Sequence, residues 1–439
     1  MFGLDWSAAL LIIIALLAIL LLAGQWVSIA LVSSSVIFLF LTGGWERPLP
    51  IGGIAWETLN SFVLTAVPLF IFMGEVIARS GLTQRLYDGI LVVLRKVPGN
   101  LLHANIGASA VLAAMSGSSS ATAAAMARIA LPQMERDGYD RKLSFASIAG
   151  GGSLGMLIPP SLGALLYGAY AELSVSRLFM AGLVPGIVLA LMISAYLFIR
   201  TRMNPALAPT SDTRVGTTTG ARLATLLRML PGLVLVLIVL GSIYSGLATP
   251  TEAAAIGAGG AVVIGFAIRG LSWRIIVDTA VSTAKVTSAL MFIVVGAHIF
   301  SAALVQSGVV RGVLEASSSF MTSPWTLFIC MAIVYVVLGM FIDGLSLMFV
   351  TLPVVIPLMH AVDFNPYLFG VLLVLFIELG QITPPVGIVL YIISASSPGS
   401  KISEIFRGAF PVVILILVLA LLIFIFPDIA LWLPEAMST

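Results

Sequence analysis

Apolar residues fill this chain in long runs that are separated by short polar segments. Runs of about 20 residues are typical of membrane-crossing helices, because about 20 helical residues cover the hydrocarbon core of a bilayer. We place ten crossings on this pattern, at residues 7–23, 27–42, 56–79, 143–172, 179–199, 225–244, 252–268, 279–305, 366–395 and 409–426. The pattern predicts an all-α polytopic membrane protein.

Two further apolar stretches do not fit as crossings, because each divides into short arms around a polar or flexible centre. The first has arms 103–115 and 121–134 around five small residues, 116–120, and the second has arms 326–338 and 345–358 around 339–344. An arm of 13 residues reaches only about 20 Å, which is too short to cross. We therefore predict re-entrant hairpins at about 101–136 and 324–361.

Two predicted crossings contain consecutive prolines, Pro159-Pro160 and Pro384-Pro385, which lie 225 residues apart. Proline removes a backbone donor and breaks a helix, and a membrane protein tolerates such a break only where protein or a water-filled cavity surrounds it. The same break in both halves indicates a transport site built from discontinuous helices. We predict broken helices at about 143–172 and 366–395.

Other residues repeat at the same offset of 225, such as Met115 with Met340 and Pro132 with Pro357. Five crossings and one hairpin precede a linker at 201–224, and five crossings and one hairpin follow it. Because five is odd, the second copy is inverted in the membrane. We predict inverted repeats at 1–200 and 225–439, with hairpin tips that meet near the midplane.

Composition and charge agree with this topology. Apolar residues make up 60% of the chain and charged residues 9%. With both termini on the periplasmic side, 16 of the 21 Lys and Arg residues fall on cytoplasmic loops, as such residues do in membrane proteins. The net charge of +2 does not indicate nucleic-acid binding, and the single cysteine, Cys330, excludes an internal disulfide and a cysteine metal cluster.

The hairpin tips and proline breaks carry the candidate chemistry. Hydroxyl and backbone carbonyl oxygens bind a hard cation such as sodium without placing many charges in lipid. The candidate sodium ligands are Ser116, Gly117, Ser118, Ser119, Ser120 and Thr122 with Ile158 and Pro159, and Gly339, Asp343 and Gly344 with Gln381 and Thr383. The N-termini of the half-helices suit a carboxylate. The candidate substrate contacts are Ser118, Ser161, Asp343, Thr383 and Pro385.

Each assignment has a structural alternative. Small residues at 116–120 also serve close helix packing. Asp343 either lies at bilayer depth, where a carboxylate costs at least about 2.5 kcal/mol, or lies nearer the interface. Glu378, just before the second break, is either a ligand or the partner of a neighbouring group. We interpret His298 as a hydrogen-bonded core residue and Arg128 as a side chain that extends to the cytoplasmic surface.

Several motifs in order resemble the large membrane subunit of tripartite ATP-independent periplasmic (TRAP) transporters, of the DctM type. They are PLFIFMGE at 68–75, the segment 116–122, GMLIPPS at 155–161, the segment 339–344 and GQITPPVG at 380–387. The resemblance extends from about residue 56 to residue 411.

The resemblance implies an elevator-type transporter in a bacterial inner membrane that uses sodium ions to import an organic acid. Its implied partners are a small four-helix membrane subunit on a separate chain and a soluble periplasmic binding protein. The tips and breaks listed above are the implied sodium and substrate regions. Sodium serves as the coupling ion, and no other cofactor is implied.

The sequence argues against two other classes of function and leaves a third open. No lysine follows a glycine, so the phosphate loop of an ATP-driven pump is absent, and the three histidines form no zinc pattern or nucleophile-base pair of an enzyme. A self-sufficient carboxylate symporter or exchanger of related architecture, coupled to sodium or protons, stays the alternative.

Overall fold

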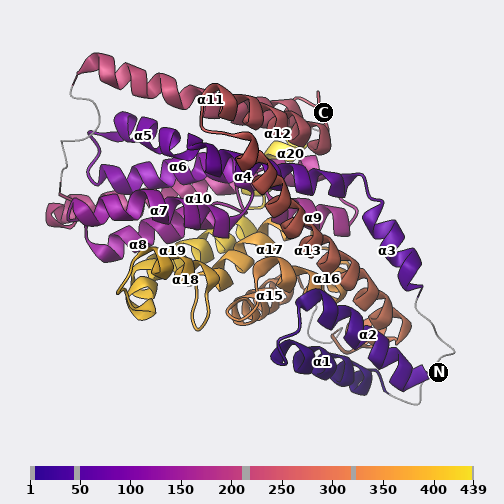
Figure 1. Ribbon diagram of the computed structural model, residues 1–439. Coiled ribbons are helices and arrows are strands. Elements are labelled where there is room, and N and C mark those ends of the chain that lie inside the picture. The colour runs from indigo at the N-terminus through magenta and orange to yellow at the C-terminus, as the bar shows by residue number, and fades with distance from the viewer. Residues whose placement is uncertain (1–4, 44–49, 210–217, 318–322, 438–439) are drawn as a thin grey trace.

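The computed structural model describes residues 5–43, 50–209, 218–317 and 323–437, and all regular elements in these ranges are helices (Figure 1). The prediction of an all-α membrane protein is confirmed. The helices are α1 Trp6–Leu22, α2 Val27–Gly43, α3 Ile51–Leu59, η2 Val63–Thr65, α4 Ala66–Ser80, α5 Leu82–Leu94, α6 Asn100–Ser116, α7 Ser119–Arg136, α8 Arg141–Ser153, α9 Leu162–Tyr170, α10 Val175–Met203, η3 Pro205–Leu207, α11 Thr219–Tyr244, α12 Pro250–Ala267, α13 Trp273–Gln306, α14 Val309–Ser317, α15 Pro324–Gly339, α16 Gly344–Ala361, α17 Pro366–Gln381, α18 Ile388–Ser396, α19 Ile402–Ile425 and α20 Asp428–Ala436.

Within the described residues, seven helical segments are long and apolar enough to cross a membrane. They are Val63–Ser80, α10, α11, α12, α13, α16 and α19. The predicted crossing at 56–79 is wrong as one helix, because α3 ends at Leu59 and α4 begins at Ala66. Pro68 lies in the first turn of α4, where its missing amide costs no intrahelical hydrogen bond.

The hairpin arms are longer than predicted. α6 and α7 have 17 and 18 residues, and α15 and α16 have 16 and 18. The additional helical residues lie mainly at the outer ends of the arms, and Ser119 and Ser120 also belong to α7. An 18-residue helix is about 27 Å long, close to the thickness of the hydrocarbon core. Arm length therefore does not distinguish these hairpins from crossings, and their re-entrant course stays a prediction.

Both predicted broken helices are interrupted at the proline pairs. Residues 154–161 separate α8 from α9, and residues 382–387 separate α17 from α18. The predicted linker at 201–224 is shorter, because α10 continues to Met203 and α11 begins at Thr219, and its residues 210–217 lie outside the described residues. The inverted relation of the two halves stays a prediction.

The hairpins and broken helices pack together in the centre of the molecule, with α11 and α12 along one side and α1 and α2 at the far end (Figure 1). Three consecutive glycines let α8 occupy the middle of this group. A Cβ atom on Gly150 would meet Ile193 of α10, one on Gly151 would meet Ser109 of α6, and one on Gly152 would meet Ala123 of α7. Because successive helical residues point about 100° apart, each glycine admits a different neighbour.

A second group of helices surrounds α13, which runs obliquely across the molecule from α12 toward α1 and α2 (Figure 1). α13 packs on α2 and α4, and also on α16 of the second hairpin. α13 therefore connects α2 to α4 and to the second hairpin.

Candidate functional site

The tip of the first hairpin is a two-residue turn between α6 and α7. Gly117 has φ +60°, a left-handed conformation that glycine adopts without steric cost at the end of a helix. Ser118 is extended, and its hydroxyl accepts a hydrogen bond of 3.4 Å from the amide of Ala121. The other four candidate residues of this tip lie within α6 or α7: Ser116, Ser119, Ser120 and Thr122.

This tip packs directly on the first interrupted helix. The amide of Leu162, the first residue of α9, donates a hydrogen bond of 3.2 Å to the carbonyl oxygen of Gly117. A Cβ atom on Gly117 would lie 2.8 Å from the carbonyl oxygen of Pro160. Glycine is therefore required here by both its backbone angle and this contact.

Two further glycines allow backbones to approach the tip. A Cβ atom on Gly155 would lie 2.6 Å from the Cα atom of Ser119, and one on Gly74 of α4 would lie 2.9 Å from the Cα atom of Ser116. The hydroxyl oxygens of Ser116 and Thr122 are buried and lie 2.9 Å apart. The tip therefore holds two buried hydroxyl groups that are hydrogen-bonded to each other.

The first interruption is itself buried. Ile158 is 5% exposed, and the peptide bond between Pro159 and Pro160 is cis. Ser161 caps α9, because its hydroxyl accepts a hydrogen bond from the α9 backbone and also donates one to the carbonyl oxygen of Met156. The hydroxyl of this candidate substrate contact is thus used to shape the break.

The second hairpin meets the second interruption in the same way. The carbonyl oxygen of Met340, just after α15, accepts hydrogen bonds from the amides of Val386 at 3.2 Å and Gly387 at 3.4 Å. A Cβ atom on Gly380 would lie 2.6 Å from the Cα atom of Gly339, so these two glycines allow α15 and α17 to touch through their backbones. Gly387 and Leu162, which make the corresponding bonds, lie 225 residues apart.

Asp343 lies at the start of α16 and is exposed. Its carboxylate accepts a hydrogen bond of 3.1 Å from the amide of Ser346 and thereby caps the helix. Its neighbour Gly344 is buried against Gln381, since a Cβ atom there would lie 2.7 Å from the Nε2 atom of that side chain. The second tip thus contacts Gln381 through Gly344, while the Asp343 carboxylate caps the N-terminus of α16.

Thr383 and Pro385, the remaining candidates at the second break, are partly buried and exposed, respectively. The hydroxyl of Thr383 donates a hydrogen bond of 2.6 Å to the carbonyl oxygen of Leu379, within its own helix end. Pro385 is exposed, and its peptide bond with Pro384 is cis. The second break is therefore more open than the first.

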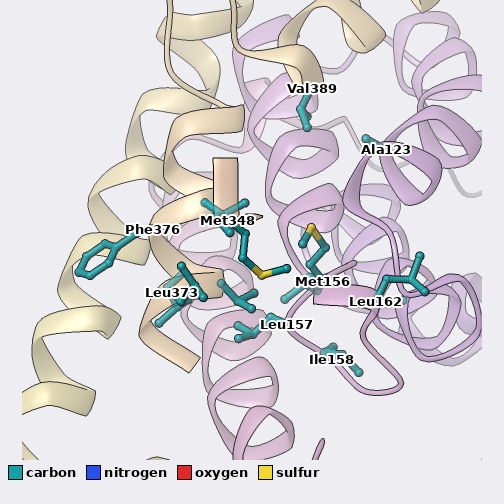
Figure 2. Packing of buried hydrophobic residues seen from close by; sticks show 14 of the residues in the cluster. Ala123, Met156, Leu157, Ile158, Leu162, Met348, Leu373, Phe376 and Val389 are labelled. Carbon is teal, nitrogen blue, oxygen red and sulfur yellow. The ribbon is translucent and has the colours of Figure 1, made fainter. Parts of the chain in front are cut away.

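Two contacts join the halves of the chain at the centre of the site. Nε2 of Gln381 lies 3.8 Å from the sulfur of Met156, and the hydroxyl of Ser119 donates a hydrogen bond to Oε1 of Glu378. Figure 2 shows Met156 within the buried hydrophobic cluster. Other labelled members of the cluster are Leu157, Ile158, Met348, Leu373 and Phe376. Sequence reasoning left the role of Glu378 open, because its partner lies 259 residues away.

Other charged or titratable residues lie away from the tips. Arg128 is exposed, and its Nε donates to the carbonyl oxygen of Ala124. The ring of His298 lies 4.5 Å from that of Tyr170, beside a cavity of about 400 Å³ that Glu57 and Glu172 also line. Within the described residues, no three His, Cys, Asp or Glu side chains are grouped to hold a metal ion.

A buried tyrosine in the loop between α7 and α8 connects the outer ends of the first hairpin. The hydroxyl of Tyr139 donates a hydrogen bond of 2.7 Å to Oδ1 of Asn100 at the start of α6. Burial raises the pKa of Tyr139 to about 12, so this hydroxyl stays a donor throughout the physiological range. The bond ties the two outer ends of the hairpin together.

A family model matches the sequence over most of the chain. The model of the tripartite ATP-independent periplasmic transporter, DctM component, matches residues 14–429. The match includes both hairpins and both interrupted helices.

Curated proteins with similar sequences are transporter permeases. The C4-dicarboxylate TRAP transporter large permease protein DctM of Pseudomonas aeruginosa is 33% identical over 383 residues, which cover 87% of this chain and 88% of that protein. The 2,3-diketo-L-gulonate TRAP transporter large permease protein YiaN of Escherichia coli is 31% identical, with coverage of 84% and 86%. The sialic acid TRAP transporter permease protein SiaT of Haemophilus influenzae is 30% identical; the match covers 86% of this chain and 61% of that longer protein.

A solved structure shares the fold at low sequence identity. The YdaH transporter of Alcanivorax borkumensis superposes with a TM-score of 0.57 over 92% of this chain and 97% of that chain. The two sequences are 15% identical. The likeness therefore concerns the fold alone.

Proposed function

Because the chain belongs to the DctM family of tripartite ATP-independent periplasmic transporters, we propose that it is the large permease of a sodium-coupled importer of an organic acid. A periplasmic binding protein delivers the acid, and a small membrane subunit on a separate chain completes the permease. The chain lies in the bacterial inner membrane with both termini on the periplasmic side.

One observation supports a transport site at the hairpin tips. Each tip offers a backbone carbonyl, of Gly117 or Met340, that accepts a hydrogen bond from the amide that follows a proline break. Unwound backbone is stable inside a membrane protein only where protein or a water-filled cavity surrounds it. Two such junctions in corresponding positions match the arrangement in which transporters bind ions and substrate between discontinuous helices.

The oxygen-rich surroundings of the first tip favour sodium as the coupling ion. The hydroxyls of Ser116 and Thr122 are buried side by side, and hard cations take oxygen ligands, which these hydroxyls supply without a buried charge. In the elevator mechanism that we propose, the two hairpins and interrupted helices move together against the helices around α13.

The names of the relatives guide the choice of substrate. The proteins described above transport C4-dicarboxylates, 2,3-diketo-L-gulonate and sialic acid, according to their names. All three are carboxylates, and the N-terminal end of a half-helix carries partial positive charge that suits such a group.

The test is uptake by proteoliposomes that contain this chain and its small subunit, with binding protein outside. Labelled C4-dicarboxylates, sialic acid and 2,3-diketo-L-gulonate are supplied under an inward sodium gradient. We expect uptake of one of these acids, and loss of uptake when choline replaces sodium. Uptake that continues without sodium would refute the coupling.

Omission of the binding protein separates the proposal from its alternative. We expect no uptake without it. Uptake by this chain alone would instead identify a self-sufficient carboxylate symporter.

A further inference from the structure

The carboxyl group of Glu378 is the most deeply buried acidic group at the centre of the site. Glu378 belongs to α17, three residues before the end of that helix at Gln381, and is 0% exposed. Burying a carboxyl group without partners is costly, so a side chain of this kind needs a structural or functional reason.

Its single hydrogen-bond partner in the described part of the chain comes from the opposite half. The hydroxyl of Ser119, in the first turn of α7, donates to Oε1 of Glu378. Ser119 is itself 1% exposed and follows Ser118, the residue that forms the turn of the first hairpin. The bond therefore fixes the first tip to the second interrupted helix.

The other carboxyl oxygen is not used in this way. Oε2 of Glu378 is buried and makes no hydrogen bond within the described residues. Of the two carboxyl oxygens, only Oε1 therefore accepts a hydrogen bond from the described residues. A neutral amide in place of the carboxyl group would supply the same acceptor.

We infer that Glu378 is a positioning residue: through Ser119 it sets the geometry of the first hairpin tip, so that the affinity of that tip for sodium depends on a residue of the other half. The inference rests on the proposed function, because it concerns the sodium site of that same transporter. It adds a residue that holds the tip in place without binding the ion.

The physical reason is the short path from the hydrogen bond to the ion ligands. Ser119 lies one turn before Thr122, whose hydroxyl faces that of Ser116 at 2.9 Å. A rotation of the first turn of α7 by loss of the Ser119 bond moves Thr122 with it, because both belong to the same helix. Cation sites are sensitive to such shifts, since binding requires several oxygens at fixed distances.

The experiment measures the sodium concentration for half-maximal uptake in the proteoliposomes described above. Glu378→Leu keeps most of the side-chain volume and removes the acceptor, and we expect this concentration to rise about tenfold, the effect of one lost hydrogen bond. Ser119→Ala should raise it by a similar factor. The double variant should be no worse than either single one, because both remove the same bond.

Glu378→Gln keeps an acceptor oxygen for Ser119, and we expect it to stay within about threefold of the unaltered protein, less than the effect of losing a hydrogen bond. If Glu378→Gln is as impaired as Glu378→Leu, a property of the carboxyl group other than its acceptor oxygen matters and the positioning role is overturned. Additive effects of Ser119→Ala and Glu378→Leu would overturn it as well.

A second serine and glutamate pair provides the matched control. The hydroxyl of Ser282 in α13 donates a hydrogen bond of 2.7 Å to Oε1 of Glu75 in α4. Ser282→Ala removes this bond from α13 and leaves in place both Glu75 and its ion pair with Arg79, and we expect it to leave the sodium dependence unchanged.

Thermal unfolding of the purified variants with the small subunit separates failure of this inference from failure of the proposed function. If uptake does not depend on sodium in the unaltered protein, the proposed function fails, while coupling between Ser119 and Glu378 in unfolding still supports their bond. If uptake is sodium-dependent and the two substitutions are uncoupled in both measurements, the inference fails and the function stands.

Discussion

The amide of Leu162 donates a hydrogen bond of 3.2 Å to the carbonyl oxygen of Gly117, and this bond joins the start of α9 to the turn of the first hairpin. The residues on either side of the bond leave no room between the two segments. The hairpin tip and the proline break are therefore one structural unit, and substitutions that separate them should affect transport.

Gly117→Ala tests this unit. The backbone at Gly117 is left-handed, and an alanine in that conformation costs about 1 kcal/mol. The new Cβ atom would also lie 2.8 Å from the carbonyl oxygen of Pro160, which adds about 1 to 3 kcal/mol. We expect a lower unfolding temperature in detergent and loss of sodium-driven uptake.

Gly24→Ala is the control for the backbone term alone. Gly24 has φ +79°, and a Cβ atom there would meet nothing within 4 Å. We expect a loss of about 1 kcal/mol in the free energy of unfolding and normal uptake. Equal effects of the two substitutions would contradict the importance of the contact with Pro160.

Gly380→Ala should separate α15 from α17 at the second tip. Its Cβ atom would lie 2.6 Å from the Cα atom of Gly339, and a backbone atom cannot move away as a flexible side chain can. We expect loss of uptake with protein that still inserts in the membrane. The control is Gly259→Ala in α12, where a Cβ atom meets nothing within 4 Å and the helix gains about 0.5 to 1 kcal/mol.

Asp343 has two possible roles that one pair of substitutions distinguishes. Asp343→Ala removes both the charge and the cap of α16, and we expect it to abolish coupled uptake and to cost about 0.5 to 2 kcal/mol of stability. Asp343→Asn keeps a side-chain oxygen for the cap and removes the charge. We expect it to fold as the unaltered protein does and yet to lose coupled uptake. Normal uptake by Asp343→Asn would limit this residue to helix capping.

The orientation can be checked by labelling single cysteines with a membrane-impermeant maleimide after Cys330→Ser. Ser245, between α11 and α12, and Arg274, near the start of α13, are both exposed. With both termini on the periplasmic side, Ser245→Cys should react in intact spheroplasts, and Arg274→Cys only after permeabilisation. The reverse pattern would contradict the topology derived from basic residues.

The sequence predicts where the two helices are interrupted, but it does not predict how many residues each interruption includes. Proline pairs mark both breaks because proline lacks an amide for the helix. The first break begins already at Leu154, a residue that by itself favours a helix, so its start depends on packing against the hairpin. The break near Asn60 was missed for another reason, since its polar residues are few within a long apolar run.

The first tip shows what composition cannot specify. Five small residues indicate a turn, but Gly117 can end one helix and Ser118 can begin the next, so two residues suffice. The partner of Glu378 was beyond sequence reasoning, because no local pattern identifies a serine in the opposite half.

The length of α13 has a consequence for the lipid environment. Its 34 residues extend about 51 Å, well beyond a hydrocarbon layer of about 30 Å. Its Arg, Asp and Lys residues are Arg274, Asp278 and Lys285, all near its start, and these can stay at the headgroups while the rest slides or tilts. The helices around α13 should therefore adapt to bilayers of different thickness by changing how much of α13 is immersed. The contacts between the hairpin tips and the proline breaks would then stay unchanged.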